Sequence, residues 1–565
     1  MDLPVLPEKT TASPLYSEDL APIPAGKRTW GMWNMAALWV GMAVCIPTYL
    51  LASYMMRAGL DWQAALVIIG LANLVITVPM VLNGHAGVKY GIPFPVQGRA
   101  AFGTLGVHVP SLLRALVACG WFGVNAWIGG LSIYSIWSAA TGSTGATGLS
   151  YGKFIAFGVF WAINIYFIWK GTERIKWLEA WSAPVLIGIG IALLTWGATN
   201  AGGISTTLRQ SRQLQQPAVQ LVPNADHPGR TLALTPLQGK DGTPKATAYR
   251  IVPMNATANT AAEWVLLSGK NTEVLLETKG EARVQFRDRE GRVSSLVDVP
   301  QAASPLGKNM LWQYLMWFTA MVGFWATMAI SISDITRFAT TQKAQVAGQF
   351  IGLPGTMMFY SFVGIFVTCA AVVALPDVLI TEDAPWDPVS LISKFNSPAV
   401  VIFAQFAMLI ATLSTNIAAN IIAPANAISN LFPKRISFRT GGVIAGLVGI
   451  AICPWWLMNE ISGTLVFVSG LLGPVLGILL CDYFLVRRRT LSVQGLYAVD
   501  GPYSFTGGFN LRAMVALAIG VLTALVGFWV KPLEPLYQIA WFVGFTVSFV
   551  LYALLMPQNG NYRKA

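Results

Sequence analysis

Charged residues are scarce in this 565-residue sequence. Asp, Glu, Lys and Arg make up 11% of it, whereas soluble domains carry about 25%. It has five cysteines, and no two of them are spaced as a CxxC pair. These shortages argue against a soluble domain, a disulfide framework and a zinc site. The N-terminal stretch "MDLPVLPEKTTASPLYSEDLAPIPAGKRTW" also lacks the apolar core of a signal peptide, so we expect the first apolar run to act as the insertion signal.

Hydrophobic residues dominate instead, at 55% of the chain, with 21 Trp and 28 Phe. A membrane-spanning helix needs about 20 consecutive apolar residues, and runs of that kind recur along the sequence. We therefore predict an all-α membrane protein with twelve transmembrane helices. The predicted spans lie near 31–55, 62–83, 109–138, 152–170, 177–199, 310–333, 347–375, 398–423, 441–457, 461–486, 511–530 and 535–556.

The formal net charge of +12 would suit a nucleic-acid-binding protein, but the cations gather in alternate short loops between the apolar runs. The other short loops hold only Arg57, Lys394 and Lys531. Because cytoplasmic loops carry an excess of Lys and Arg, we predict that both termini lie in the cytoplasm, with a bacterial inner membrane as the expected location. The cationic loops contain Lys89, Arg99, Lys170, Arg174, Lys176, Arg337, Lys343, Lys434, Arg435, Arg439, Arg487, Arg488 and Arg489.

Residues 204–307, between the fifth and sixth predicted spans, have the composition of a soluble domain. Runs such as "TAYRIVPM" and "ARVQFRD" alternate polar and apolar residues, and "RDREGRV" indicates a hairpin turn. We predict a small, mostly β domain outside the membrane, with a disordered loop as the alternative. The chain is thus divided into a tail (1–30), a first five-span half (31–199), the insert (200–309), a second half (310–486), two final spans (487–556) and a tail (557–565).

Two predicted spans contain residues that interrupt helices, and they head the two halves. In "WVGMAVCIPTYL", Pro47 cannot donate a backbone hydrogen bond and Gly41 adds freedom, while Gly323 lies at mid-depth in "AMVGFWATMAISISDITRF". Helices interrupted at matching positions of two halves indicate a transporter's binding site, because freed carbonyls there bind a cation. A packing kink is the alternative explanation.

The eighth apolar run carries polar residues in "ATLSTNIAAN". Ala411, Ser414 and Thr415 share one helical face, so a carbonyl and two hydroxyls would offer neutral oxygen ligands to a monovalent cation. Asn416 and Asn420 lie one turn apart, and an Asn side chain presents a donor and an acceptor together, which matches an amide or imide edge. Bonds to the helix's own backbone or between helices are the alternative.

Aromatic residues at mid-span predict where a flat ligand would lie. Trp121 and Asn125 share a face in "CGWFGVNAWIGG", and Trp325 follows the sixth-span interruption. Two indoles could stack on either side of a heterocycle, while Asn125 and Asn420 bind its edge. Interfacial anchoring is the alternative for tryptophans in general, although mid-span depth weakens it for these two.

These motifs resemble the nucleobase–cation symporter family one, which includes bacterial hydantoin, allantoin and uracil permeases. The resemblance covers nearly all of residues 30–530 and rests on "AALWVGMAV", "GWFGVNAW", "VGFWATMAISISDITRF", "ATLSTNIAANIIAP", "FPKRISFRTG" and "CDYFLVRRR" in order. It implies a leucine-transporter-type five-plus-five inverted repeat. It also implies a sodium site made by Gly41, Val44, Ala411, Ser414 and Thr415, and a substrate site made by Trp121, Asn125, Trp325 and Asn420.

Two positions depart from the family pattern. Position 125 is Asn where hydantoin, uracil and allantoin carriers have Gln, and Cys45 stands where a hydantoin carrier has a polar amide. We therefore include Cys45 among the substrate-binding candidates and leave the exact substrate open.

The function expected from these features is import of a nucleobase or related heterocycle by cation symport. Sodium is the expected coupling ion, with protons as the alternative, and no organic cofactor is expected. The expected partners are a small heterocycle and the lipid bilayer, not a nucleic acid. A membrane sensor that uses the external insert as its receiver is a second class. A membrane enzyme ranks last, since the spans show no nucleophile–base pair or metal-ligand cluster.

Overall fold

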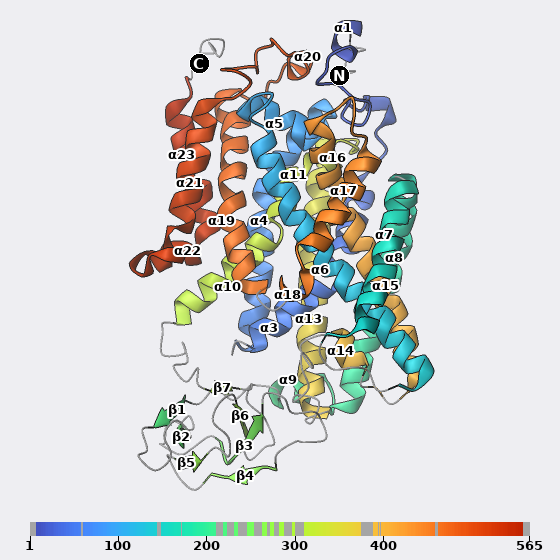
Figure 1. The fold of residues 1–565 in the computed structure, drawn as a ribbon, viewed down its shortest axis with the longest axis vertical. Coiled ribbons are helices and arrows are strands. Elements are labelled where there is room, and N and C mark those ends of the chain that lie inside the picture. The colour runs from blue at the N-terminus through green and yellow to red at the C-terminus, as the bar shows by residue number, and fades with distance from the viewer. Residues whose placement is uncertain are drawn as a thin grey trace.

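A computed structural model shows the protein as a bundle of long helices with small β-sheets at one end (Figure 1). The first and last described residues both lie at the opposite end of the bundle. The structure describes residues 7–57, 60–143, 149–170, 172–210, 218–222, 231–235, 246–253, 263–267, 272–275, 282–287, 297–299, 310–374, 388–393, 395, 397–457 and 461–557.

The first half of the bundle follows the predicted spans, with boundaries set by local signals. Asp61 caps α4 by accepting a hydrogen bond from the Ala64 amide, and Gly91 ends that helix with a φ of 70°. This helix therefore runs seven residues past the predicted end at residue 83. The helices here are α1 (Glu8–Thr11), α2 (Met32–Ala43), α3 (Ile46–Arg57), α4 (Trp62–Tyr90), α5 (Phe94–Phe102), α6 (His108–Thr141), α7 (Tyr151–Lys170), α8 (Thr172–Asn200) and α9 (Ile204–Gln210), with a short 3₁₀ turn at Ala25–Lys27.

The second half begins with a helix in three pieces and ends with two packed helices. These elements are α10 (Met310–Phe324), α11 (Ala326–Ser331), α12 (Ser333–Thr336), α13 (Gln342–Ala374), α14 (Pro388–Ile392), α15 (Pro398–Asn420), α16 (Ile422–Leu431), α17 (Phe438–Ala451), α18 (Pro454–Leu457), α19 (Ile461–Leu480), the π-helical turn η6 (Cys481–Val486), α20 (Val493–Leu496), α21 (Leu511–Trp529), η7 (Lys531–Leu533), α22 (Glu534–Gln538) and α23 (Ala540–Leu555).

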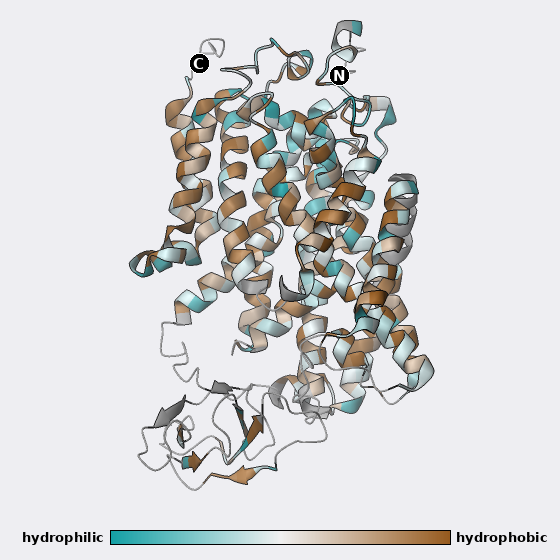
Figure 2. Ribbon diagram, in the orientation of Figure 1, coloured by the Kyte–Doolittle hydropathy of each residue, from teal (hydrophilic) through white to brown (hydrophobic). Residues whose placement is uncertain are grey.

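Hydrophobic residues recur along the helices of the bundle (Figure 2), and many large apolar side chains are exposed, as expected of a surface that faces lipid. Along α4, Val67, Leu71, Leu74 and Val78 are each 46–57% exposed and recur at helical spacing on one face. Eight helices in the described residues are long and apolar enough to cross a membrane, or up to ten if each of two bent pairs counts as one span. The prediction of twelve is thus met in part. Two other predicted spans contain shorter apolar stretches, Ile187–Asn200 and Phe438–Ala451.

The predicted insert contains the β-structure of the described chain. One antiparallel sheet has the order β1-β2-β5, and a second has the order β4-β3-β6-β7. Leu232 and Leu234 of β2, with Tyr249, Val284 and Phe286, form an apolar core between them. The predicted hairpin turn after Arg287 lies outside the described residues. The strands are β1 (Ala218–Val222), β2 (Thr231–Thr235), β3 (Ala248–Pro253), β4 (Val265–Leu266), β5 (Thr272–Leu275), β6 (Ala282–Arg287) and β7 (Val297–Val299).

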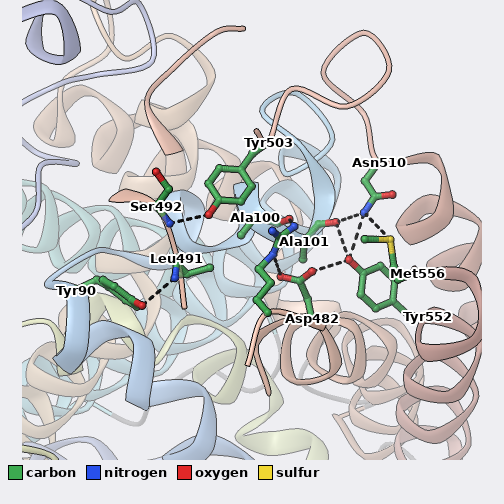
Figure 3. A network of polar contacts seen from close by, with 11 residues as sticks. Tyr90, Ala100, Ala101, Asp482, Leu491, Ser492, Tyr503, Asn510, Tyr552 and Met556 are labelled. Carbon is green, nitrogen blue, oxygen red and sulfur yellow. Dashed lines mark hydrogen bonds and ion pairs between the residues drawn. The ribbon is translucent and has the colours of Figure 1, made fainter. Parts of the chain in front are cut away.

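A buried polar network joins the last helix to the rest of the bundle (Figure 3). The Asp482 carboxylate of η6 forms an ion pair with Arg487 at 2.7 Å and accepts a hydrogen bond from the Tyr552 hydroxyl at 2.7 Å. Asn510 donates to the Ala101 carbonyl at 2.6 Å. Because both charges are buried and paired, this network ties α5, η6 and α23 together, and removing one partner would leave a buried charge uncompensated.

Candidate functional site

The first predicted span is broken, as expected, but at Val44 and Cys45 rather than at Pro47. Helices α2 and α3 meet there at an angle of 57°. A proline ring clashes with the carbonyl four residues earlier unless it lies in the first turn of a helix. The chain meets this requirement because α3 begins at Ile46, which places Pro47 in its first turn.

The break frees backbone carbonyls. In an unbroken helix the Cys45 amide would donate to Gly41, but here it donates to the Ala43 carbonyl at 3.0 Å. Likewise, the Thr48 amide would donate to Val44 but donates to Cys45 at 3.1 Å. Gly41 and Val44, the two predicted carbonyl ligands, are therefore among the residues whose carbonyls lose their helical hydrogen bonds.

Helix α15 brings its predicted ligands to this break. The Thr415 hydroxyl donates to the freed Gly41 carbonyl at 3.0 Å, so these two oxygens already lie side by side. Ser414 is fully buried one residue earlier, and Ala411 packs in the same apolar cluster as Val44. Neutral carbonyl and hydroxyl oxygens in a buried place suit a hard monovalent cation, so the donor set fits the predicted sodium site in chemistry.

The sixth predicted span is interrupted at Trp325, two residues after the predicted position. Trp325 leaves the helix with φ −99° and ψ 3°, between α10 and α11. Gly323 has a different role, because a Cβ there would lie 2.8 Å from the Ser469 Cβ of α19 and 2.9 Å from the Leu465 carbonyl oxygen. The glycine thus permits close packing of two helices, while the tryptophan marks the break.

A cavity lies where the two broken helices meet α6 and α15. All five residues predicted to bind substrate line it, together with one of the predicted cation ligands. Its volume is about 30 Å³, enough for about two water molecules. The lining residues are Met42, Cys45, Pro47, Trp121, Asn125, Phe324, Trp325, Thr327, Met328, Thr415, Ala419 and Asn420.

Aromatic rings form part of the cavity lining. A third ring, that of Phe324, contacts both of the predicted indoles. Phe324 lies edge-on to Trp121, with ring centroids 5.5 Å apart, and also contacts Trp325 at 4.9 Å. Trp39 of α2 packs edge-on behind Trp325 at 5.2 Å. Sequence reasoning missed Phe324 and Trp39, although both stand within the quoted motifs.

Amide groups on two helices supply the polar part of the cavity. The Asn125 side chain donates to the Trp121 carbonyl at 3.0 Å, and its own buried carbonyl oxygen accepts no hydrogen bond from the described residues. Asn420 donates to Asn416 at 3.1 Å. Asn416 in turn donates to Asn164 of α7 at 3.1 Å, so it joins helices and does not line the cavity. Cys45 contacts Thr48 at 3.2 Å between the sulfur and the hydroxyl oxygen.

Beside the cavity, a fully buried arginine joins three elements. Arg114 of α6 donates to the Ser331 hydroxyl of α11 at 3.0 Å and to the Ala419 carbonyl of α15 at 3.2 Å. Sequence reasoning missed Arg114, although a cation within a predicted span was signal enough.

The buried Asp334 accepts from the Phe94 amide at 3.0 Å, while its second oxygen has no hydrogen-bond partner among the described residues.

Comparisons with known proteins show the family to which the chain belongs. A sequence profile described as "Permease for cytosine/purines, uracil, thiamine, allantoin" matches residues 22–224 and 291–544. An allantoin permease of Bacillus subtilis is 32% identical, with 96% of this chain and 93% of that protein covered. A purine-uracil permease of Arabidopsis thaliana is 31% identical over 97% of this chain and 78% of its own length.

Solved structures share the fold. Mhp1, a nucleobase-cation-symport-1 family transporter in a closed conformation with bromovinylhydantoin bound, superposes with a TM-score of 0.67 at 20% identity, covering 97% of this chain and 98% of Mhp1. A Na⁺-coupled sialic acid symporter superposes with a TM-score of 0.56 at 11% identity, covering 94% of this chain and 91% of that chain. Profile, relatives and fold agree, and the chain is a multi-pass membrane protein that belongs to the nucleobase–cation symporter family one, a family of permeases and not of enzymes.

Proposed function

We propose that the protein imports a flat heterocyclic amide or imide of the uracil, allantoin or hydantoin class. The observation that carries this proposal is the convergence of Trp121, Asn125, Trp325 and Asn420 on one cavity. Indole faces stack on a planar ring, and amide side chains match the alternating donors and acceptors of its edge. The names of the relatives, which include allantoin, purine-uracil and hydantoin permeases, support the same class.

The ligand requires more room than the cavity of about 30 Å³ offers. Binding therefore involves separation of the surrounding elements, and the breaks at Val44–Cys45 and Trp325 are the natural places for it. In the proposed cycle, substrate binds with the site open to the outside, the helices close around it, and the opposite side then opens.

Sodium is the proposed coupling ion. Gly41, Val44, Ala411, Ser414 and Thr415 would bind it beside the substrate cavity, which Thr415 also lines. A cation there would hold α2 against α15. Coupling follows if cation and substrate both favour this same arrangement of helices, since a ligand shifts a conformational equilibrium only by its difference in affinity for the two states.

The proposed topology has twelve spans in a five-plus-five inverted repeat and two further helices. Counting the shorter stretches Ile187–Asn200 and Phe438–Ala451 with the ten candidate spans would complete that number. The proposed insert at 200–309 lies outside and both tails lie inside, most simply in a bacterial inner membrane. The position of the sheets and termini at opposite ends of the bundle supports this assignment (Figure 1).

Proton coupling is a second candidate, favoured by one observation. Asp334 is buried, close enough to Arg114 and Arg337 for their charges to influence it, and burial raises its pKa to about 6. A buried carboxyl group whose pKa is raised in this way could carry a proton.

Uptake into proteoliposomes tests both versions. We expect radiolabelled uracil, allantoin or hydantoin to accumulate when an inward sodium gradient is imposed, and not with potassium at equal pH on both sides. Accumulation driven only by an inward proton gradient would favour the Asp334 version. Saturable binding without uptake under any gradient would contradict transport and favour a membrane sensor.

A further inference from the structure

A second, larger cavity opens at the end of the bundle that carries the termini. Its volume is about 550 Å³, and it is formed by four segments that lie far apart in the sequence. These are the N-terminal stretch before α2, the end of α4, the start of α13 and the turn after η6. The lining residues are Ala25, Arg28, His85, Val88, Lys89, Thr340, Thr341, Gln342, Arg488 and Arg489.

The charge of this cavity is of one sign. Four of its lining residues are Arg or Lys, none is Asp or Glu, and none of the four cations forms an ion pair with a described residue. The first residue of α13, Gln342, also lines the cavity, so the positive end of this 33-residue helix adds to the potential. Like charges repel, and an anion between them would relieve that repulsion through charge-assisted hydrogen bonds.

Two of the four cations, Arg28 and Lys89, are held in position by hydrogen bonds to backbone carbonyls. Arg28 donates to the Ile23 carbonyl at 3.0 Å and also to the Val88 carbonyl. Lys89 donates to the Arg489 carbonyl at 2.7 Å, and Tyr90 donates to the same oxygen at 3.0 Å. These bonds fix the turn that presents the two arginines.

That turn is also strained. Arg488 and Arg489 have φ angles of 48° and 60°, in the left-handed region, where a side chain other than glycine costs about 1–2 kcal/mol per residue. Glycine at these two positions would end the helix equally well and without strain. Two consecutive residues other than glycine in this conformation are uncommon, and strained residues of this kind cluster at ligand sites.

We propose that this cavity binds a phosphate-bearing anion. Guanidinium and ammonium groups that converge from several segments recognise phosphate oxygens, and the volume accommodates a phosphate with its organic substituent. The excess of cations in cytoplasmic loops accounts for the sign of the charge but not for its convergence on one cavity.

The surroundings of the cavity are compatible with a phospholipid headgroup as the source. Leu82 lies one turn from His85 and Leu485 lies three residues from Arg488, and these two leucines are 40% and 46% exposed. Such side chains would contact acyl chains while the cations bind the headgroup. A soluble phosphate has the same chemistry at its charged end, so the test separates the two sources.

The test uses the purified full-length protein in a neutral detergent. Binding of phosphatidylglycerol, zwitterionic phosphatidylcholine and inorganic phosphate is measured by native mass spectrometry and by the shift in melting temperature. The variants are Arg488→Gln and Arg489→Gln, singly and together. The double variant Arg435→Gln/Arg439→Gln is the matched control, because it removes the same charge from exposed positions outside the cavity.

We expect binding of phosphatidylglycerol, but not of phosphatidylcholine, to weaken about 5-fold for each cavity arginine removed and to stay unchanged in the control. Inorganic phosphate that binds in the millimolar range and displaces the lipid would support the anion site and assign it to a soluble ligand. Equal losses in the cavity and control variants would overturn the proposal, as would an absence of binding by either anion. If the double variant fails to fold, the single Arg488→Gln variant carries the same comparison.

Discussion

At the level of single residues, one rule located part of the candidate site. Polar side chains within a hydrocarbon-depth helix are expensive unless they are paired or functional, and this rule singled out Ser414, Thr415 and Asn420. It could not show what each one contacts. Asn416 carries the same signal as Asn420, yet it bonds to Asn164 of another helix and does not line the cavity. Only the packing of α15 against α6 and α7 distinguishes them.

The hydroxyl of Thr415 gives the first prediction. Thr415→Val keeps the shape of the side chain but removes the oxygen that contacts Gly41 at 3.0 Å. We expect this hydroxyl to contribute about 1–2 kcal/mol to the free energy of sodium binding. Its loss should therefore raise the sodium concentration needed for half-maximal uptake by about 10-fold. Thr412→Val is the control, because the Thr412 hydroxyl bonds to Met408 in its own helix. Equal sodium activation in both variants would remove Thr415 from the cation site.

The carboxyl group of Asp334 gives a prediction about pH. Burial, the largest cause, raises its pKa from 3.8 to about 6, against the opposing effects of Arg337, the Phe94 amide and Arg114. Because the folded state holds the proton more tightly than the unfolded state, this group favours folding most below pH 4, and that contribution is lost as the pH rises through 6. Asp334→Asn cannot titrate.

Melting curves of the two proteins at several pH values check this prediction. The wild type should lose stability relative to Asp334→Asn between pH 4 and pH 6, by on the order of 1–3 kcal/mol. A constant difference across that range would mean that Asp334 keeps its ordinary pKa. Arg114 and Arg337 stay charged across this pH range, so neither adds a pH-dependent change in stability of its own.

At the level of elements, the sequence predicted which helices break but not where. Pro47 signals a break because of its missing amide, yet the break itself precedes it, since a proline is tolerated in the first turn of the next helix. Gly323 was a weaker signal, because glycine marks either a break or a close approach. A Cβ at this position would lie only 2.9 Å from the Leu465 carbonyl oxygen, so Gly323 permits close packing of the two helices and does not mark the break.

A pair of glycine substitutions tests that assignment. Gly323→Ala should destabilise the protein by about 1–3 kcal/mol, because its Cβ would overlap the backbone of α19. Gly355→Ala in α13 is the control, since no heavy atom lies within 4 Å of its Cβ position. That change should be neutral or stabilising by up to about 1 kcal/mol, through helix propensity alone. Thermal unfolding in detergent measures both, and similar shifts in the two variants would contradict close packing at Gly323.

At the level of the whole molecule, the order of the apolar runs and the amino-acid composition predicted a helical membrane protein with a β-containing insert. The exact number of spans depends on how the helices tilt and bend, which these features do not show. The insert shows the limit most clearly. Its alternating runs predicted strands, but pairing across the sheets, such as β2 with β5, joins segments that no local pattern relates. The family profile also stops at residue 224 and resumes at 291, so the segment between lies outside what the family shares.

Removal of residues 225–290 tests whether the insert takes part in transport. Strands β1 and β7, on either side of that segment, are in contact, so a short Gly-Ser linker can join their neighbouring residues without pulling on α8 or α10. Loop length contributes only weakly to closure entropy, and stability of the bundle should change by about 1 kcal/mol or less. We therefore expect substrate uptake and its sodium dependence to persist in proteoliposomes. A shortened chain that folds and binds substrate but no longer transports it would show instead that the insert belongs to the transport cycle, because a passive appendage cannot separate binding from translocation.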